Sequence, residues 1–462
     1  MAATRELPVF ELRQIGPRTF EDEAARKRVV SPVNHRAKRR WLGVIAILVI
    51  GIAGYAIFGR PNWGQGKFFS DQTYHFQTLR VLNDVTADGA DVSDVLETVK
   101  HIRSGDAQGW FRAWSETASR ATRLASATTD QVARGRALLR AHTYYRTAEF
   151  FLAPEDPKRP VSAARNIQSF YAGLDALAVV YERIKVPYDG HYLDAVYYPA
   201  PDVNHKRPLI MFGGGFDSTL EELYFLLGKD AHEHGYDVLT YDGPGQGSAL
   251  REQGLTFTHE WEKPTKSVMD TFLASHARPE KIVLVGASMG GYLAPRAAAF
   301  DGRFDGVVAW DVMFDMGAVA QRYAPPAMFW LRDHGFGFVI DLLIRAKMAQ
   351  SPGFRWAVSN GMWTLGTKHP LDTARALQKY TLAGVAERIK ADVLILAGAE
   401  DHFVPIGQVA QFEKALTAAR SVTTVIYDRP SGGAEHCQVG AQALWHATFF
   451  DWMTAKFGAA VL

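Results

Sequence analysis

The chain has 462 residues, of which 47% are hydrophobic, and a formal net charge of +2. This length is too great for one small domain and suits one large α/β domain with helical additions. Basic residues do not cluster with aromatic residues in the main part of the chain, so nucleic-acid binding has no support. The single cysteine, Cys437, excludes an intramolecular disulfide framework.

The N-terminal region predicts a membrane anchor. Residues 1–40 are charged and lack hydrophobic periodicity, which is typical of a disordered basic tail, and residues 41–58 carry no charge. This uncharged run would span roughly 27 Å as a helix, enough for the hydrocarbon layer of a bilayer. The basic residues before it predict a cytoplasmic N-terminus, with residues 59–67 as a linker and the rest of the chain on the extracytoplasmic side. A cleaved signal peptide is the alternative, but the basic region is long for one and no Ala-x-Ala site follows.

Residues 68–175 show helical patterning without strands, which predicts a helical N-terminal domain that caps the rest of the protein. Asp91 is a candidate N-cap, and residues 131–151 form a long amphipathic pattern. Prolines at 154, 157 and 160 mark the end of that helix.

Residues 176–462 predict a mostly parallel sheet with flanking helices. Strand signals begin at residues 179–181 and 191–193, and strands then alternate with helical stretches. Between the strand at 306–310 and the strand at 393 the gap far exceeds one crossover connection. Residues from about 312 to 385 are rich in aromatic side chains, so we expect a helical lid over the site. A packed structural insertion is the alternative.

The motif that carries the chemistry follows an apolar strand at 281–285. Gly286, Ala287, Ser288, Met289 and Gly290 come directly after it, and this strand-turn-helix pattern is typical of a nucleophile elbow. The turn would hold the serine hydroxyl above the end of a parallel sheet, with glycines where strand and helix pass closely. The alternative is an ordinary strand-to-helix turn.

An acid and a base follow Ser288 in the order that such a site requires. Asp401 lies just past a late buried strand, and Glu400 is the alternative acid. His436 follows the last strand and a glycine-rich loop, so we expect it to be the base, whereas His402 is interpreted as a loop residue. We interpret Cys437 as a packing residue whose side chain points away from that of His436.

An oxyanion hole completes the predicted site. One backbone N–H is expected from Met289, the residue after the nucleophile. The glycine-rich loop at 213–218 follows the strand at 208–212 and would supply the second, from Phe216 or alternatively from Gly215. A tight turn without this role is the alternative for the loop.

Other chemistries lack their motifs. The chain has no Gly-x-x-x-x-Gly-Lys-Ser/Thr loop, residues 243–247 do not have dinucleotide spacing, and residues 232–234 do not have zinc-protease spacing. We therefore expect neither a cofactor nor a metal.

Together these motifs resemble the α/β-hydrolase subfamily that includes 2,6-dihydroxypseudooxynicotine hydrolase and the fungal polyketide-shortening hydrolases of pigment pathways. The resemblance runs from about residue 68 to the end and rests on Asp401 and on the segments AEFFL at 148–152, GGFDST at 214–219, YDGPGQG at 241–247, GASMGGYLAPRAAA at 286–299 and AEHC at 434–437.

The resemblance implies an N-terminal helical domain over an α/β-hydrolase core and a Ser288–Asp401–His436 triad. It also implies that the bond cleaved is either an ester or a carbon–carbon bond beside a ketone. Glu262 is a candidate residue of the substrate pocket, with a surface ion pair as its alternative.

The sequence thus predicts a membrane-anchored serine hydrolase that forms an acyl-enzyme from a small, partly apolar ester or ketone. One alternative is an acyl-aminoacyl or dipeptidyl-type peptidase, for which Glu149 or the pair Glu221 and Glu222 would have to bind a free amine. The other is a non-catalytic binding protein on a hydrolase fold, whose expected signature is a broken triad.

Overall fold

The computed structural model describes residues 68–200, 208–321 and 326–458. The predicted tail, membrane anchor and linker all lie outside these ranges. Within them, no helix combines the length and the hydropathy needed to cross a membrane.

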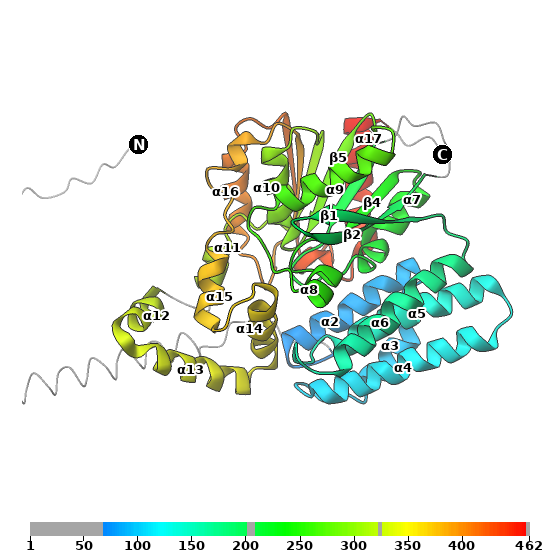
Figure 1. The fold of residues 1–462 in the computed structure, drawn as a ribbon, viewed down its shortest axis with the longest axis horizontal. Coiled ribbons are helices and arrows are strands. Elements are labelled where there is room, and N and C mark those ends of the chain that lie inside the picture. The colour runs from blue at the N-terminus through cyan, green and yellow to red at the C-terminus, as the bar shows by residue number, and fades with distance from the viewer. Residues whose placement is uncertain (1–67, 201–207, 322–325, 459–462) are drawn as a thin grey trace, which may run out of the picture. The chain divides into compact units, whose positions relative to one another are not determined.

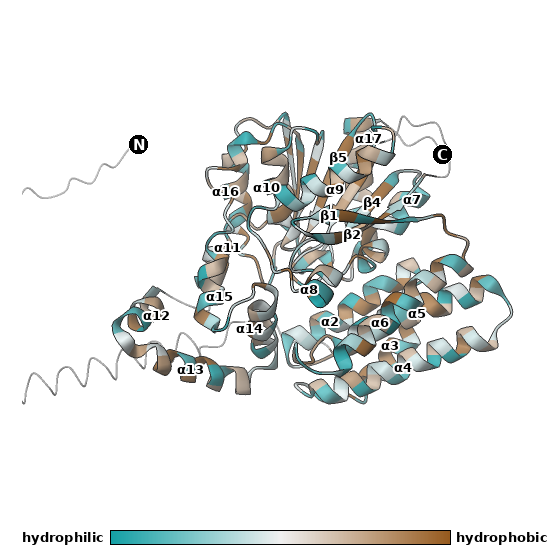
Figure 2. Ribbon diagram, viewed as in Figure 1, coloured by the Kyte–Doolittle hydropathy of each residue, from teal (hydrophilic) through white to brown (hydrophobic). Residues whose placement is uncertain are grey.

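The first part of the described chain is helical, as Figure 1 shows. Its helices are α2 (Gln72–Asn83), α3 (Val92–Val99), α4 (Ala107–Ala127), α5 (Gln131–Glu149) and α6 (Lys158–Ala176). Four of them begin at an aspartate whose side chain accepts backbone N–H groups of the first turn, namely Asp71, Asp91, Asp106 and Asp130. Hydrophilic and hydrophobic residues are mixed along these helices (Figure 2). The helices bury a cluster of aromatic rings that includes Tyr74, Trp110, Trp114, Tyr144 and Phe151.

The rest of the chain is built on one eight-stranded sheet in the described residues, with the order β1-β2-β4-β3-β5-β6-β7-β8. The strands are β1 (Glu182–Tyr188), β2 (His191–Tyr198), β3 (Leu209–Gly213), β4 (Asp237–Tyr241), β5 (Ile282–Ala287), β6 (Gly306–Trp310), β7 (Asp392–Gly398) and β8 (Ser421–Tyr427). Only the β1–β2 and β2–β4 pairs are antiparallel. The predicted α/β fold with a mostly parallel sheet is confirmed.

The first strand begins later than the sequence pattern indicated, at Glu182 instead of Val179. Ala178 has a φ of 55°, and the N–H of Val179 donates to the carbonyl of Leu174 at 3.0 Å. This is a Schellman ending of α6, which satisfies the last helical carbonyls. The β-branched valine therefore belongs to the end of a helix.

Helices cover both faces of the sheet, and side chains alternate between two hydrophobic clusters. On β3, Leu209 and Met211 pack into one cluster, whereas Ile210 and Phe212 pack into the other. Besides the lid and the N-terminal helices, this part of the chain contains α7 (Lys229–Glu233), α8 (Gly247–Gln253), α9 (Glu262–Ser275), α10 (Gly290–Phe300), α16 (Gly407–Ala415) and α17 (Gln442–Phe457). Helix α10 contributes Leu293 to the first cluster, and α17 contributes Trp445 to the second.

The long connection from β6 to β7 is helical. It contains α11 (Met316–Gln321), α12 (Pro326–Leu331), α13 (Gly337–Gln350), α14 (Pro352–Thr364) and α15 (Pro370–Leu377). These helices share a small core that includes Met328, Ile340 and Leu371. Helix α14 also contacts the N-terminal helices, because the Trp356 and Phe150 rings stack with centroids 4.6 Å apart.

Strand β5 and helix α10 meet at a sharp turn that sets the position of Ser288. A Cβ on Gly286 would lie 2.1 Å from the carbonyl oxygen of Gly290, and a Cβ on Gly291 would lie 2.0 Å from that of Asp311. Ser288 has a φ of 60°, in the left-handed region that a non-glycine residue rarely adopts. The turn therefore depends on glycine at its closest contacts.

We expect Gly286→Ala to destabilise the protein by about 1–3 kcal/mol or more, the usual cost of overpacking. The added methyl group would meet backbone that cannot move aside without shifting α10. The matched control is Gly302→Ala, because a Cβ at Gly302 has no atom within 4 Å, and its effect should stay within about 0.5 kcal/mol. Thermal unfolding of both variants measures this, and equal melting temperatures would contradict the close approach.

Candidate active site

Ser288, His436 and Asp401 lie together at the carboxyl ends of the parallel strands. His436 Nε2 is 2.8 Å from Ser288 Oγ, and His436 Nδ1 is 2.6 Å from Asp401 Oδ2. The other oxygen of Asp401 accepts the N–H groups of Phe403 and Val404 at 2.6 and 2.9 Å. The histidine is only 3% exposed. The structure thus brings the three predicted residues into one hydrogen-bonded line.

The two other candidates near Asp401 lie elsewhere. Glu400 is exposed and pairs with Arg429, whose Nε lies 2.9 Å from Glu400 Oε1. His402 Nδ1 is 3.2 Å from a carboxylate oxygen of Glu435, and its ring centroid is 6.3 Å from that of His436. Neither side chain takes the place of Asp401 or His436 in the line.

Burial and charge shift the pKa values of Asp401 and His436 in opposite directions. Burial would raise the pKa of Asp401, but the facing imidazole outweighs it and holds the pKa below its ordinary value. Burial would likewise lower the pKa of His436, but the charge of Asp401 holds it well above its ordinary value. The aspartate therefore stabilises a positive charge on the imidazole.

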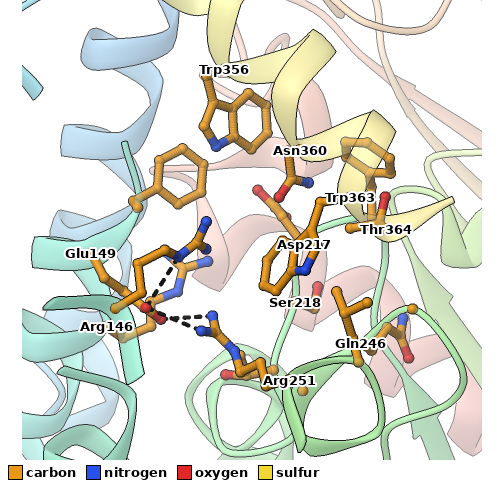
Figure 3. A pocket seen from close by; sticks show the side chains of 17 residues that line it. Arg146, Glu149, Asp217, Ser218, Gln246, Arg251, Trp356, Asn360, Trp363 and Thr364 are labelled. Carbon is orange, nitrogen blue, oxygen red and sulfur yellow. Dashed lines mark hydrogen bonds and ion pairs between the residues drawn. The ribbon is translucent and has the colours of Figure 1, made fainter. Parts of the chain in front are cut away.

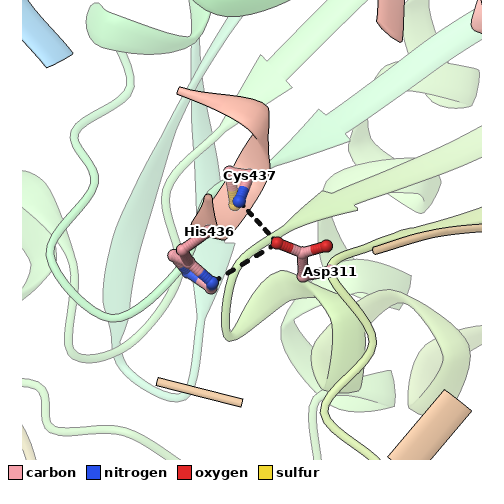
Figure 4. A group of neighbouring side chains, drawn as sticks. All are labelled: Asp311, His436 and Cys437. Carbon is pink, nitrogen blue, oxygen red and sulfur yellow. Dashed lines mark hydrogen bonds and ion pairs between the residues drawn. The ribbon is translucent and has the colours of Figure 1, made fainter. Parts of the chain in front are cut away.

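Asp311 is a second buried carboxylate that the sequence analysis missed. It follows β6 directly, and its Oδ2 lies 3.4 Å from His436 Nδ1 (Figure 4). It accepts the backbone N–H groups of Gly398 and Cys437 at 3.1 and 2.5 Å. Burial, and then the charge of Asp401, raises the pKa of Asp311 to about 7. The rule that selected Asp401, an acid just past a strand, also fits Asp311.

The prediction that the side chains of Cys437 and His436 point apart is wrong. Cys437 has a φ of 51°, which turns the chain instead of extending it. One ligand atom each from Asp311, His436 and Cys437 lies within 4.8 Å of the others. These are metal-ligand types, but both ring nitrogens of His436 already bond to Ser288 and Asp401. This arrangement leaves the imidazole no lone pair for a metal.

The predicted oxyanion loop lies against Ser288. A Cβ on Gly215 would lie 2.8 Å from Ser288 Cβ and 3.0 Å from the backbone nitrogen of Met289. The Gly215 N–H itself donates to Ser218 Oγ at 2.9 Å. Because that donor is engaged within the loop, the geometry favours Phe216 over Gly215 as the second donor.

A cavity of about 260 Å³ lies over Ser288. Besides Ser288 and His436, it is lined mostly by apolar side chains from α2, the lid and nearby loops, including Phe76, Met313, Ile344, Trp356 and Phe403. Lid helices thus form part of its wall. Glu262 is not among the lining residues, because it pairs with Arg296 at 2.9 Å on the surface of α9 and α10.

A second, smaller cavity of about 40 Å³ adjoins the first. The two share Phe216, Asp217, Ser218 and Trp356 in their walls. Its other walls carry charged groups, as Figure 3 shows.

Comparison with known proteins agrees with this geometry. Residues 210–440 match the model of the Alpha/beta hydrolase family. The chain is 32% identical to the hydrolase acrC of Aspergillus aculeatus and 31% identical to a 20-hydroxy-prefusarin hydrolase of Gibberella moniliformis, in each case over 85% of this chain and 98% of the relative.

Among solved structures, 2,6-dihydroxy-pseudo-oxynicotine hydrolase superposes with a TM-score of 0.64 at 20% identity, over 82% of this chain and 96% of that one. At this identity the likeness concerns the fold. The resemblance read from the motifs is confirmed: the chain belongs to the alpha/beta hydrolase family.

Proposed function

We propose that this chain is a serine hydrolase that works through an acyl-enzyme. Ser288 is the nucleophile, His436 the general base and Asp401 the acid that orients the imidazole. The observation that carries the proposal is the buried histidine that bonds Ser288 Oγ at 2.8 Å and Asp401 Oδ2 at 2.6 Å. Asp401 fixes the tautomer in which Nε2 accepts the serine proton.

The reaction proceeds in two halves. Ser288 Oγ attacks the substrate carbonyl while His436 takes its proton, and the N–H groups of Met289 and Phe216 bind the oxyanion. Collapse of this intermediate expels the leaving group, which the imidazolium protonates. Water, activated by the same histidine, then attacks the acyl-enzyme and releases the acid.

The substrate class follows from the cavity. Its largely apolar wall suits a small, partly apolar molecule, and the triad acts on an ester carbonyl without further help. The fungal relatives are hydrolases, and the family resemblance adds ketones. For a ketone, the electrons of the broken carbon–carbon bond leave with the departing carbon, which His436 protonates. That carbon must be acidic, as in a 1,3-diketone.

The two alternatives have less support. A peptidase needs a free, charged carboxylate for the substrate amine, but Glu149 pairs with Arg159 and Arg251, and Glu222 pairs with two further arginines. Burial raises the pKa of Glu221, the third candidate, to about 7, which favours its neutral form. A non-catalytic binding protein would not need the unbroken hydrogen-bonded line through His436.

We further propose that residues 41–58 anchor the enzyme in a membrane, with the N-terminus in the cytoplasm and the catalytic domain on the opposite side. The support is the uncharged run itself and the basic residues that precede it.

Ser288→Ala should abolish turnover, with a loss on the order of 10⁵- to 10⁶-fold in kcat, because triad residues act as a unit. A fluorophosphonate probe should label the full-length wild type and not this variant. The control is Ser267→Ala on α9, which should label like the wild type. A screen of esters, aryl ketones and 1,3-diketones then identifies the bond cleaved. Equal turnover by Ser288→Ala would refute the assignment.

Asp401→Asn should lower kcat by about 10³- to 10⁴-fold, because asparagine no longer selects the correct imidazole tautomer. The pKa of His436 should also fall, since the charge of Asp401 is what raises it. A base works when neutral, so the acid limb of the kcat/KM profile should move to lower pH. Glu400→Gln is the matched control, and a profile that moved in this variant instead would contradict the choice of acid.

The full-length protein should remain in the membrane fraction after an alkaline carbonate wash. A variant that lacks residues 41–58 should appear in the wash, because the basic tail alone does not insert. Protease protection in sealed vesicles measures which side carries the catalytic domain. Release of the full-length protein by carbonate would contradict the anchor.

A further inference from the structure

The smaller cavity beside the active site is richer in charged groups than the larger one. Three guanidinium groups line it, from Arg146 and Arg159 on the N-terminal helices and from Arg251 on α8 (Figure 3). The carboxylate of Glu149 accepts from Arg251 at 2.7 and 3.1 Å and from Arg159 at 3.4 Å. The single carboxylate of Glu149 thus pairs with two guanidinium groups.

The surrounding ion-pair network contains more cations than anions. Glu222 lies 2.5 Å from Arg80 and 3.0 Å from Arg146, and Asp217 lies 3.1 Å from Arg80. Four arginines, Arg80, Arg146, Arg159 and Arg251, therefore share the three carboxylates of Glu149, Asp217 and Glu222. Each arginine has an ion pair, but the network contains one more positive charge than negative charges.

Two neighbouring acids balance this charge only in part near neutral pH. Burial, and then the charge of Glu222, raises the pKa of Asp84 to about 8, and burial raises the pKa of Glu221 to about 7. Burial, and then the charge of Arg80, lowers the pKa of Arg146. A buried cation in excess favours a bound anion, because an uncompensated charge is costly away from water.

A second observation points to an acceptor ligand in the same place. Asn360 on α14 is 6% exposed and lines this cavity, and its Nδ2 has no hydrogen-bond partner among the described residues. Thr219 Oγ1, also in the wall, likewise has none within the described part of the chain. A buried donor left unpaired costs about 1–3 kcal/mol. An acceptor from a ligand would satisfy the amide.

The arginines around the cavity are held in place. The Trp363 ring lies 4.6 Å from Arg159 Cζ and 5.5 Å from Arg251 Cζ, so one indole packs against both guanidinium groups. Fixed guanidinium forks match the planar geometry of a carboxylate. A cavity of about 40 Å³ holds a few water molecules, since one water needs roughly 10–15 Å³. This is the size of one carboxylate group.

We propose that the smaller cavity is a carboxylate subsite, in which Arg146, Arg159, Arg251 and Asn360 bind an acid group at the end of the substrate. The inference rests on the proposed function, because the apolar body of that substrate lies in the larger cavity with its carbonyl at Ser288. Phe216, Asp217, Ser218 and Trp356 lie in the walls of both cavities, so the two subsites are adjacent. The preferred substrate is therefore amphiphilic, with a carboxylate at the end away from the bond that is cleaved.

Binding tests the subsite without turnover. In the full-length Ser288→Ala protein, isothermal titration calorimetry should give octanoate and decanoate at least 10-fold tighter binding than 1-octanol and 1-decanol. Adding Asn360→Leu or Arg251→Gln should reduce this preference to less than about threefold. Arg303→Gln is the charge-matched control, because Arg303 pairs with Asp270 and Asp301 outside the cavity, and it should retain the full preference.

Asn360→Leu keeps every ion pair, so it tests the subsite even where Arg251→Gln does not fold. Equal affinity for acid and alcohol in the parent protein would overturn the proposal. An equal loss of preference in Arg303→Gln would also overturn it, because general electrostatic attraction would then explain the binding.

Turnover separates this inference from the proposed function. In proteins that retain Ser288, kcat/KM is measured for two esters, the 4-nitrophenyl monoester of sebacic acid and 4-nitrophenyl decanoate. The ratio of the first value to the second should fall at least 10-fold in Asn360→Leu, and not in Arg303→Gln. No hydrolysis of either ester, with the binding preference intact, would refute ester hydrolysis and leave the subsite. Hydrolysis of both with an unchanged ratio would refute the subsite and leave the hydrolase.

Discussion

The close approach of strand β5 to helix α10 is the constraint on which the site depends. A side chain at Gly286 or Gly291 would overlap backbone at 2.1 or 2.0 Å, so strand and helix can pack only with glycine there. The chain must then reverse within a few residues, which places Ser288 at a φ of 60°. Such strain costs on the order of 1–3 kcal/mol and persists only where packing over-determines the backbone. Here the fully buried strand β5, at the centre of the sheet, supplies that packing.

The strained turn places Ser288 at a cavity whose wall is mostly apolar. Phe76 of α2 and Phe403 lie with their ring centroids 6.1 and 5.1 Å from that of His436. In so apolar a setting the attraction between His436 and Asp401 is stronger than it would be in water. The helical domain that supplies Phe76 is joined to the core by the buried pairs of Arg80 and Arg146 with Glu222. Buried ion pairs contribute little net stability, but they fix which groups meet.

Where the signal was local, the sequence named residues that the structure places side by side. A strand, a Gly-x-Ser-x-Gly turn and a helix start lie within a few residues, and the order of acid and base along the chain selected Asp401 and His436. Sequence reasoning failed where partners are distant: Cys437 meets Asp311 across 126 positions, and Arg80 meets Glu222 across 142. Hydrophobic periodicity in the sequence does not predict contacts between residues so far apart. The onset of β1 was misplaced for a different reason, because the helix ending at Ala178 overrides the β propensity of the valines that follow.

The loop at 213–219 contacts both the proposed catalytic residues and the arginine network. Gly215 lies against Ser288 and Met289, Phe216 is the favoured second oxyanion donor, and Asp217 pairs with Arg80. The same loop borders both the larger, mostly apolar cavity and the smaller, arginine-lined one. A substrate that fills both would press on the backbone that must hold the oxyanion, so binding energy from its remote end can be used to position the reacting carbonyl. A ligand that fills only the larger cavity would lack that contribution, so the proposed subsite would make the enzyme discriminate by the end of the molecule that does not react.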